Sequence, residues 1–120
     1  MTTSALASEE EMPARNSFFD LEPVIVNLAA PDTNRYLQVT FTYELSGDTT
    51  LENMKTYLPI IRSRALMVLS TKTAEEISSP QGKNLLLDQL LDAARYTLTG
   101  VDFNPGKGVE NVHLTSFIIQ

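Results

Sequence analysis

The stretch "RYLQVTFTYEL" (residues 35–45) alternates apolar and polar side chains without interruption. Successive side chains of a β-strand point to opposite faces of the sheet, so this pattern predicts a strand with one buried and one wet face. The positions predicted to face the core are Leu37, Val39, Phe41, Tyr43 and Leu45. The other face carries Gln38, Thr40, Thr42 and Glu44.

Two other β-branched runs predict strands on either side of this one in the sequence. The run "PVIVNLA" (23–29) precedes it, and the connecting "APDTN" holds Pro31, which presets a turn that Asp32 can close through its side chain. These features predict an antiparallel hairpin. The final stretch "VENVHLTSFIIQ" (109–120) is rich in branched residues and predicts the last strand.

A helical pattern follows the hairpin. Thr49 and Glu52 have the spacing of a capping box, which predicts a helix start. Pro59 interrupts the pattern at a cost of about 3 kcal/mol, so we expect a kink or a true start near residue 58, and the continuing apolar pattern favours the kink. The apolar stripe on which a core would pack is Leu51, Met54, Leu58, Ile61, Ala65 and Val68.

The stretch "STKTAEEISSPQGKNLLLDQLL" (70–91) contains two further helix starts one turn apart. Thr73 with Glu76 forms a capping box, and Ser79 followed by Pro80 is a second start signal. We predict a short helix, a rigid corner, and a helix that runs to about Thr99. Gly100 is expected to close that helix in the left-handed conformation. The fold class is therefore α+β, in the order β-β-α-(short α)-α-β.

The composition divides the chain into a tail and one domain. The opening "MTTSALASEEEMPARNS" has too few large apolar residues to join a core, so we expect residues 1–19 to be a disordered linker remnant. Residues 20–120 are expected to fold as a unit. A domain of roughly 100 residues buries on the order of two thirds of its unfolded surface, enough for one core without metal or disulfide support.

Charge and hydropathy exclude two classes of partner for this stretch. The net charge is −6 and the nine basic residues are scattered, whereas nucleic-acid binding needs clustered Lys and Arg. No run approaches the roughly 20 apolar residues of a membrane helix. We expect the given chain to be soluble, with any membrane anchor upstream of it.

The sequence offers little that could perform catalysis or hold a cofactor. His113 is the only histidine, there is no cysteine, and no serine and acid are indicated as triad partners. The loop "GVDFNPGKG" has five residues between Gly100 and Gly106 where a phosphate loop has four, and Gly108 occupies the Ser/Thr position. "DFNPGK" also breaks the calcium-loop pattern. We therefore expect no enzyme, no metal and no cofactor.

Both long helices carry more apolar residues than one core-facing stripe requires. A second apolar face could meet a neighbouring subunit, or a compact helical layer could bury it internally. The residues concerned are Ile60, Leu66, Met67 and Leu69 on the middle helix and Leu85, Leu86, Leu87, Leu90, Leu91, Ala93, Ala94 and Leu98 on the last.

Several stretches resemble the periplasmic domain of FliL, the flagellar basal body-associated protein. They are "LEPVIVNL" (21–28), "RYLQVTFTYEL" (35–45), "LPIIRSRALMVLSTKTAEEISSPQGK" (58–83) and "TSFIIQ" (115–120). The resemblance implies a fold similar to the stomatin/prohibitin (SPFH) domain. It also implies attachment to the bacterial inner membrane, on its periplasmic side, by an upstream helix that this chain does not contain.

The partners implied by this resemblance are further copies of the chain in a ring and the flagellar stator, MotA/MotB or PomA/PomB. The implied function is non-enzymatic: the ring supports the active, ion-conducting state of the stator, and thereby torque and motility. The rival reading is a soluble binding module that takes a peptide or small ligand at the open edge of the sheet.

The candidate interface residues fall into two groups. One lies just before the first predicted strand, where it could meet a neighbour or the stator, or simply cover the bottom edge of the domain. The other is the densest basic group on the middle helix, where the alternative is a solvated face. The candidates are Phe18, Phe19, Leu21, Arg62, Arg64 and Lys72.

Overall fold

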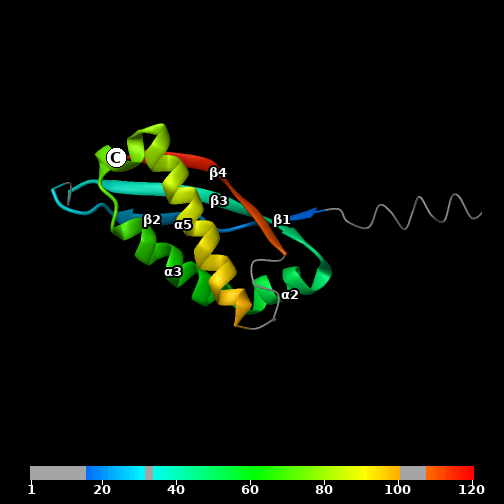
Figure 1. Ribbon diagram of the computed structural model, residues 1–120. Coiled ribbons are helices and arrows are strands. Elements are labelled where there is room, and N and C mark those ends of the chain that lie inside the picture. Colours follow the sequence, from blue (N-terminus) through cyan, green and yellow to red (C-terminus); the bar gives the residue numbers. More distant parts are fainter. Residues whose placement is uncertain (1–15, 32–33, 101–107) are drawn as a thin grey trace, which may run out of the picture.

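The computed structural model describes residues 16–31, 34–100 and 108–120. Its two layers are a small antiparallel sheet and a set of helices that cover one face of it (Figure 1). The strands are β1 (Asn16–Asp20), β2 (Val24–Asn27), β3 (Tyr36–Ser46) and β4 (Val109–Ile119). The helices are α2 (Asp48–Thr56), α3 (Leu58–Ser70), α4 (Ala74–Ser78) and α5 (Pro80–Thr99). The predicted α+β class is confirmed.

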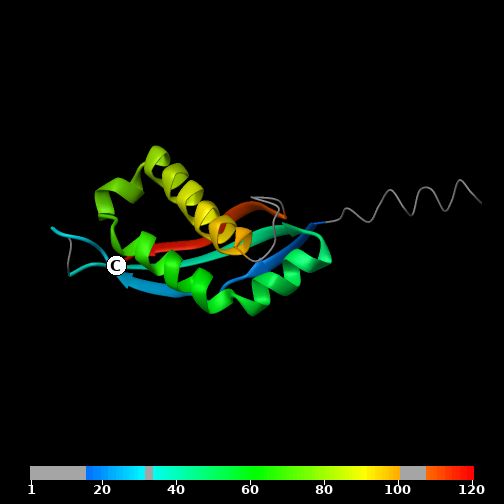
Figure 2. The ribbon, with the colours of Figure 1, turned by 60° about the horizontal axis from the view of Figure 1, so that its bottom comes forward.

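β3 is the central strand of the sheet. β4 pairs with it from Leu37 to Leu45, so β4 occupies one of its two edges. β1 pairs with residues 42–46 and β2 with residues 36–39, and both must therefore lie end to end along the other edge (Figure 2). The predicted hairpin, β2 with β3, and the predicted last strand, β4, are confirmed.

The strand β1 differs from the sequence expectation. Residues 16–19, which we expected in the tail, pair with β3 in the same sheet as β2. The segment "NSFFD" is too short and too polar to predict a strand by itself, and it is ordered because the end of β3 offers it a partner edge. The observed order is thus β-β-β-α-α-α-α-β.

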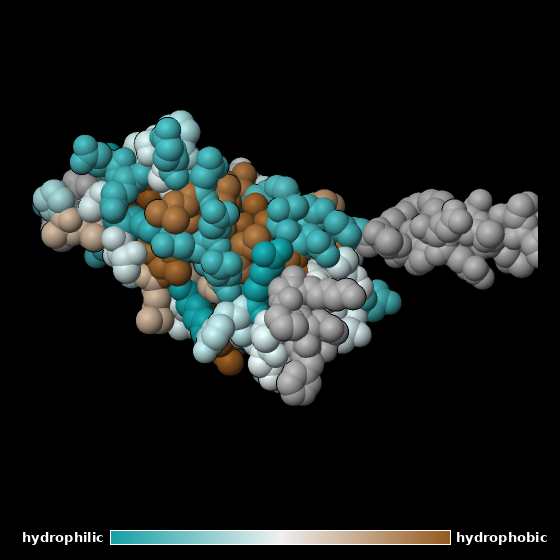
Figure 3. Space-filling view, in the orientation of Figure 1, coloured by the Kyte–Doolittle hydropathy of each residue, from teal (hydrophilic) through white to brown (hydrophobic). Residues whose placement is uncertain are grey.

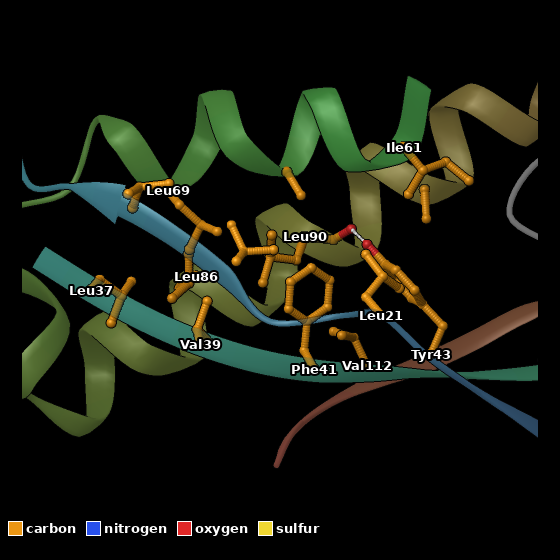
Figure 4. Packing of buried hydrophobic residues seen from close by; sticks show 14 of the residues in the cluster. Leu21, Leu37, Val39, Phe41, Tyr43, Ile61, Leu69, Leu86, Leu90 and Val112 are labelled. Atoms are coloured by element: carbon orange, nitrogen blue, oxygen red, sulfur yellow. Dashed lines mark hydrogen bonds between the residues drawn. The ribbon is translucent and has the colours of Figure 1, made fainter. Parts of the chain in front are cut away.

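The alternation of β3 sets the position of the core. Its five predicted inward residues are fully buried, as predicted. Figure 4 shows four of them on the face of β3 that the helices cover: Leu37, Val39, Phe41 and Tyr43. Their neighbours on the core-facing side of β4 include Val112, and those on the helices include Ile61 and Leu90. Side chains at the intervening positions of β3 point to the opposite face of the sheet, which we call the open face.

The first helix start lies elsewhere than predicted. Gly47, with a φ of 88°, turns the chain out of β3 and is itself the N-cap of α2, so the helix begins at Asp48. Thr49 is then already inside the helix and cannot act as its N-cap. The predicted Thr49–Glu52 capping box is therefore wrong, because the left-handed glycine takes precedence over the side-chain signal.

The chain forms two separate helices near Pro59, whereas the sequence pattern favoured one kinked helix. α2 ends at Thr56, and α3 starts afresh at Leu58 with Pro59 in its first turn, where a missing backbone N–H costs nothing. The alternative of a true start near residue 58 is thus the correct one. The predicted apolar stripe is confirmed, with Met54, Ile61 and Ala65 buried and the other members packed against the core.

The predicted corner between the last two helices is confirmed in its details. The Thr73 hydroxyl accepts a hydrogen bond from the Glu76 amide, and the Glu76 carboxylate accepts one from the Thr73 amide. The Ser79 hydroxyl accepts one from Gly82, with Pro80 at the first position of α5. Gly82 packs so closely on α4 that an added Cβ would overlap the carbonyl group of Glu76.

Two smaller expectations concern the ends of loops. α5 ends at Thr99 as predicted, but Gly100 has a φ of −68°, so the predicted left-handed closure is wrong. The chain continues in a right-handed turn, which needs no glycine. The proposed turn residue Asp32 and the loop after Gly100 lie outside the described residues.

Candidate functional site

The three N-terminal candidates have three different environments. Phe18 projects from β1 onto the open face and is 63% exposed. Phe19 points the other way, is half-buried, and packs against the core. Leu21 is only 2% exposed and belongs to the core itself. Of these three side chains, only that of Phe18 is largely exposed.

Arg62 is engaged within the molecule. The pairing register slips by one residue between β1 and β2, which leaves Glu22 and Pro23 outside the regular ladder. Arg62 donates to both of their carbonyl oxygens, each at 3.1 Å, and so ties α3 to this edge of the sheet. Its guanidinium stabilises the interruption of the strand.

Replacing Arg62 with alanine is expected to lower the free energy of unfolding by about 1 kcal/mol, because two backbone carbonyls lose a charged donor. Arg35→Ala, at an exposed site just before β3, is the control and should change it by less than about 0.5 kcal/mol, as at most surface positions. Urea unfolding followed by circular dichroism measures both. Equal losses would contradict the distinct structural role of Arg62.

The other two basic candidates lie apart. Arg64 faces α5, where it donates to the hydroxyl of Thr97 at 3.2 Å and stands over the Tyr96 ring, 4.8 Å from the centroid. Lys72 is half-buried just past the end of α3, where its backbone carbonyl accepts from the amide of Ala29. The predicted basic group is therefore not one cluster, and Arg64 alone points into a groove.

That groove runs between the start of α3 and the end of α5 and has a volume of about 430 Å³. Its lining is mostly apolar, and Arg64 is the one charged residue among the described residues that line it. The lining comprises Tyr57, Ile60, Arg64, Tyr96, Thr97, Thr99 and Gly100.

Further apolar side chains are exposed along the outer surface of both helices, which together with the groove we call the helical face. Met67 is 66% and Tyr96 is 72% exposed, and Ile60 and Leu85 are exposed as well. Figure 3 shows apolar side chains over α3 and α5, separated by polar ones. The other apolar residues singled out on the two helices are buried or half-buried, so part of the surplus serves the core and part remains outside.

Tyr96 is the prominent residue of this face that the sequence analysis missed. It lies eleven residues after Leu85 in α5. Eleven residues make about three helical turns, so both side chains share one stripe. The sequence contains the signal: continuing the apolar stripe from Leu85 to the end of α5 leads to Tyr96.

The open face carries the histidine. His113 Nε2 lies 2.9 Å from Glu44 Oε1, and the rings of Phe18 and His113 are 6.3 Å apart between centroids. An ionised carboxylate only accepts, so the imidazole is the donor. The hydrogen bond from His113, followed by that from Asn16, holds the pKa of Glu44 below its ordinary value.

We expect the Glu44–His113 pair to make the stability of the fold depend on pH in the acid range. A depressed carboxyl pKa contributes stability that is present above the unfolded value, about 4.5, and is lost as pH falls through the folded value. The difference in melting temperature between the wild type and Glu44→Gln should therefore shrink as pH falls below about 4.5. Glu52→Gln, at an exposed site on α2, is the control. A difference that stays constant from neutral pH to pH 3 would contradict the expectation.

A metal or catalytic centre needs several ligating or reactive side chains close together. Within residues 16–31, 34–100 and 108–120, no three His, Cys, Asp or Glu side chains gather to hold a metal ion. The His113 side chain contacts the Phe18 ring and the Glu44 carboxylate, and the hydroxyl of its cross-strand neighbour Thr42 is donated to Asp20. The described surface has a mostly apolar groove on the helical face, and an open face that carries Phe18, Glu44 and His113.

The sequence of this chain is similar to that of one known protein family over most of its length. The family described as "Flagellar basal body-associated protein FliL" matches residues 18–120. The "Flagellar protein FliL" of Aquifex aeolicus is 33% identical over 98 residues, which are 82% of this chain and 57% of the relative. The protein of the same name from Escherichia coli K12 is 30% identical over 103 residues, 86% of this chain and 64% of the relative.

The chain thus spans about three fifths of the length of these relatives. In the part that the structure describes, no helix is long and apolar enough to cross a membrane. The family match begins in β1 and extends through β4, so it covers both faces described above. The chain belongs to the FliL family of flagellar basal body-associated proteins.

Proposed function

We propose that this chain is a non-enzymatic accessory domain of the flagellar motor that assembles with its own copies around the stator. The stator is of the MotA/MotB or PomA/PomB kind, and the assembly lies on the periplasmic side of the inner membrane, held by an upstream helix. The domain would share the SPFH type of fold. Binding the ion-conducting stator better than the idle one shifts the population toward conduction.

The observation that carries this proposal is the helical face. A monomeric protein rarely leaves neighbouring large apolar side chains exposed, and such patches mark interaction sites. Here Ile60 and Tyr96 line a groove in which Arg64 is the one cation among the described residues, and Met67 is exposed on the same helix as Ile60. The chain belongs to a family associated with the flagellar basal body, which is an assembly of several proteins, and this supports a protein partner for the helical face.

Cross-linking of the full-length, membrane-anchored protein in its own cells tests the proposal. We expect capture of both the protein itself and a stator component, and we expect deletion of the gene to reduce torque under high viscous load. Complementation with the wild-type gene restores torque. Unchanged torque in the deletion strain, with no stator component captured, would exclude the proposed role.

A further inference from the structure

The residues that line the groove of the helical face indicate the chemistry of the group that would bind there. Tyr57, Ile60 and Tyr96 supply apolar walls, and Arg64 supplies a guanidinium. Arginine carries five N–H donors in a planar fork suited to a carboxylate, and its bond to Thr97 uses only part of them. An occupant that fits both parts needs an apolar side chain and a carboxylate close together.

The open face of the same chain presents such a pair. Phe18 and Asp20 are two residues apart on β1, so both project from the open face. The Asp20 side chain is exposed, and it accepts a hydrogen bond from the Thr42 hydroxyl through Oδ1 at 2.7 Å. One carboxylate oxygen is thus fixed within the molecule, which orients the group without neutralising its charge.

The spacing of the two pairs agrees. Two residues along a strand span about 6.6 Å. In α3, Ile60 and Arg64 are four residues apart, which is about one helical turn, 5.4 to 6 Å. The other exposed apolar residue on this sheet edge, Ile25, has Asn27 at the corresponding position and offers no carboxylate.

We propose that the α3–α5 groove of one copy receives Phe18 and Asp20 of the next copy, with Asp20 on Arg64. The inference rests on the self-association proposed above and names its two surfaces. Local charge complementarity favours a second copy as the occupant, because the chain itself presents an exposed carboxylate, Asp20, two residues from an exposed ring, Phe18. The groove supplies the cation, Arg64, that the carboxylate of Asp20 would pair with.

The two surfaces lie on opposite sides of the molecule, since the groove is on the helices and Phe18 is on the sheet face turned away from them. The contact is therefore heterologous: each copy uses a different face toward each neighbour. Such contacts propagate into a ring when the rotation closes and into a filament when it does not. A symmetric pair of copies cannot form through them.

Cysteine pairing tests the arrangement, because the chain has no cysteine of its own. Asn16→Cys on the open face lies four residues from Asp20, about 13 Å along the strand. Ser63→Cys lies beside Arg64 on α3, and both positions are exposed. A bis-maleimide reagent that spans about 13 Å is therefore used to join the two cysteines. The variants carry an N-terminal histidine tag and are held on phosphatidylcholine vesicles containing nickel-chelating lipid. A mixture of the two variants should cross-link to dimers, while each variant alone should not. Dimers of Ser63→Cys with itself would overturn the proposal.

Charge reversal gives a second, independent readout on the same vesicles. Arg64→Asp and Asp20→Arg should each weaken self-association by about tenfold, the equivalent of about 1.4 kcal/mol, and the double variant should regain most of it. Arg35→Asp, an equal charge change at an exposed site beyond the other end of α3, is the control. Circular dichroism checks that each variant is folded.

The possible failures are distinguishable. If the wild-type chain associates but neither reversal weakens it, the surfaces named here are wrong and the proposed function stands. If Arg64→Asp abolishes capture of a stator component in cells and leaves self-association intact, the groove holds the stator, and this inference is overturned. If the wild type remains monomeric at every density, this inference and the proposed self-association fail together.

Discussion

Replacing Gly82 with alanine is expected to destabilise the domain by about 3 kcal/mol or more. The added methyl group would overlap the Glu76 carbonyl and lie 2.7 Å from its carbon. Backbone cannot rotate away as a side chain can, so α4 and α5 must separate or the corner must unfold. This puts the loss at the top of the range for overpacking. Urea unfolding followed by far-ultraviolet circular dichroism measures it.

Gly100→Ala is the matched control for this change. Gly100 lies at the other end of α5, its φ is right-handed, and its added Cβ would meet the Thr97 carbonyl oxygen at an ordinary 3.6 Å. Its stability should change by less than about 0.5 kcal/mol. If Gly82→Ala is as stable as Gly100→Ala, the two helices do not depend on this close approach.

The corner also matters for the proposed interface. α3 and α5 bound the groove from its two sides, and α4 with its two caps is the connection between them. A change at Gly82 alters how α5 leaves α4 and thus the width of the groove some 20 residues away in sequence. A folded but loosened corner is expected to weaken self-association although no groove residue is changed.

The features that the sequence predicted correctly have local causes. The alternation of β3 specifies its two faces by the geometry of a strand alone. The caps of α4 and α5 are satisfied within three residues, between Thr73 and Glu76 and between Ser79 and Gly82. These signals do not depend on the rest of the chain. Locality alone is not sufficient, because the capping box predicted at Thr49 and Glu52 is equally local and is displaced by Gly47.

The features that the sequence did not predict depend on how separate helices and strands pack against one another. β1 is a strand only because β3 extends to Ser46 beside it. Gly82 looks like an ordinary glycine until α4 is placed against it. Arg62 and Arg64 are two residues apart in one basic run, yet α3 directs one to the sheet edge and the other to α5. The tertiary structure was therefore needed to tell which candidate interface residues are exposed and which have structural roles.

Tyr43→Ala is expected to lower the free energy of unfolding by about 3–5 kcal/mol, the cost of deleting a large buried ring. Tyr43 is fully buried, packs edge-to-face on Phe41 with centroids 5.6 Å apart, and joins the two layers by donating its hydroxyl to the Leu90 carbonyl at 2.8 Å (Figure 4). Tyr43→Phe keeps the ring and should cost only about 1 kcal/mol. If the two variants have equal stabilities, the hydrogen bond contributes more than the packing.

The same residue should make the domain sensitive to alkali. Burial raises the pKa of the Tyr43 phenol well above its ordinary value of about 10. A raised folded pKa contributes stability that is complete below the unfolded value and is lost as pH rises above it, by about 1.4 kcal/mol per unit. The stability advantage of the wild type over Tyr43→Phe, measured by urea unfolding from pH 8 to pH 11, should therefore disappear above about pH 10. An advantage that persists to pH 11 would mean that the phenol ionises within the folded core.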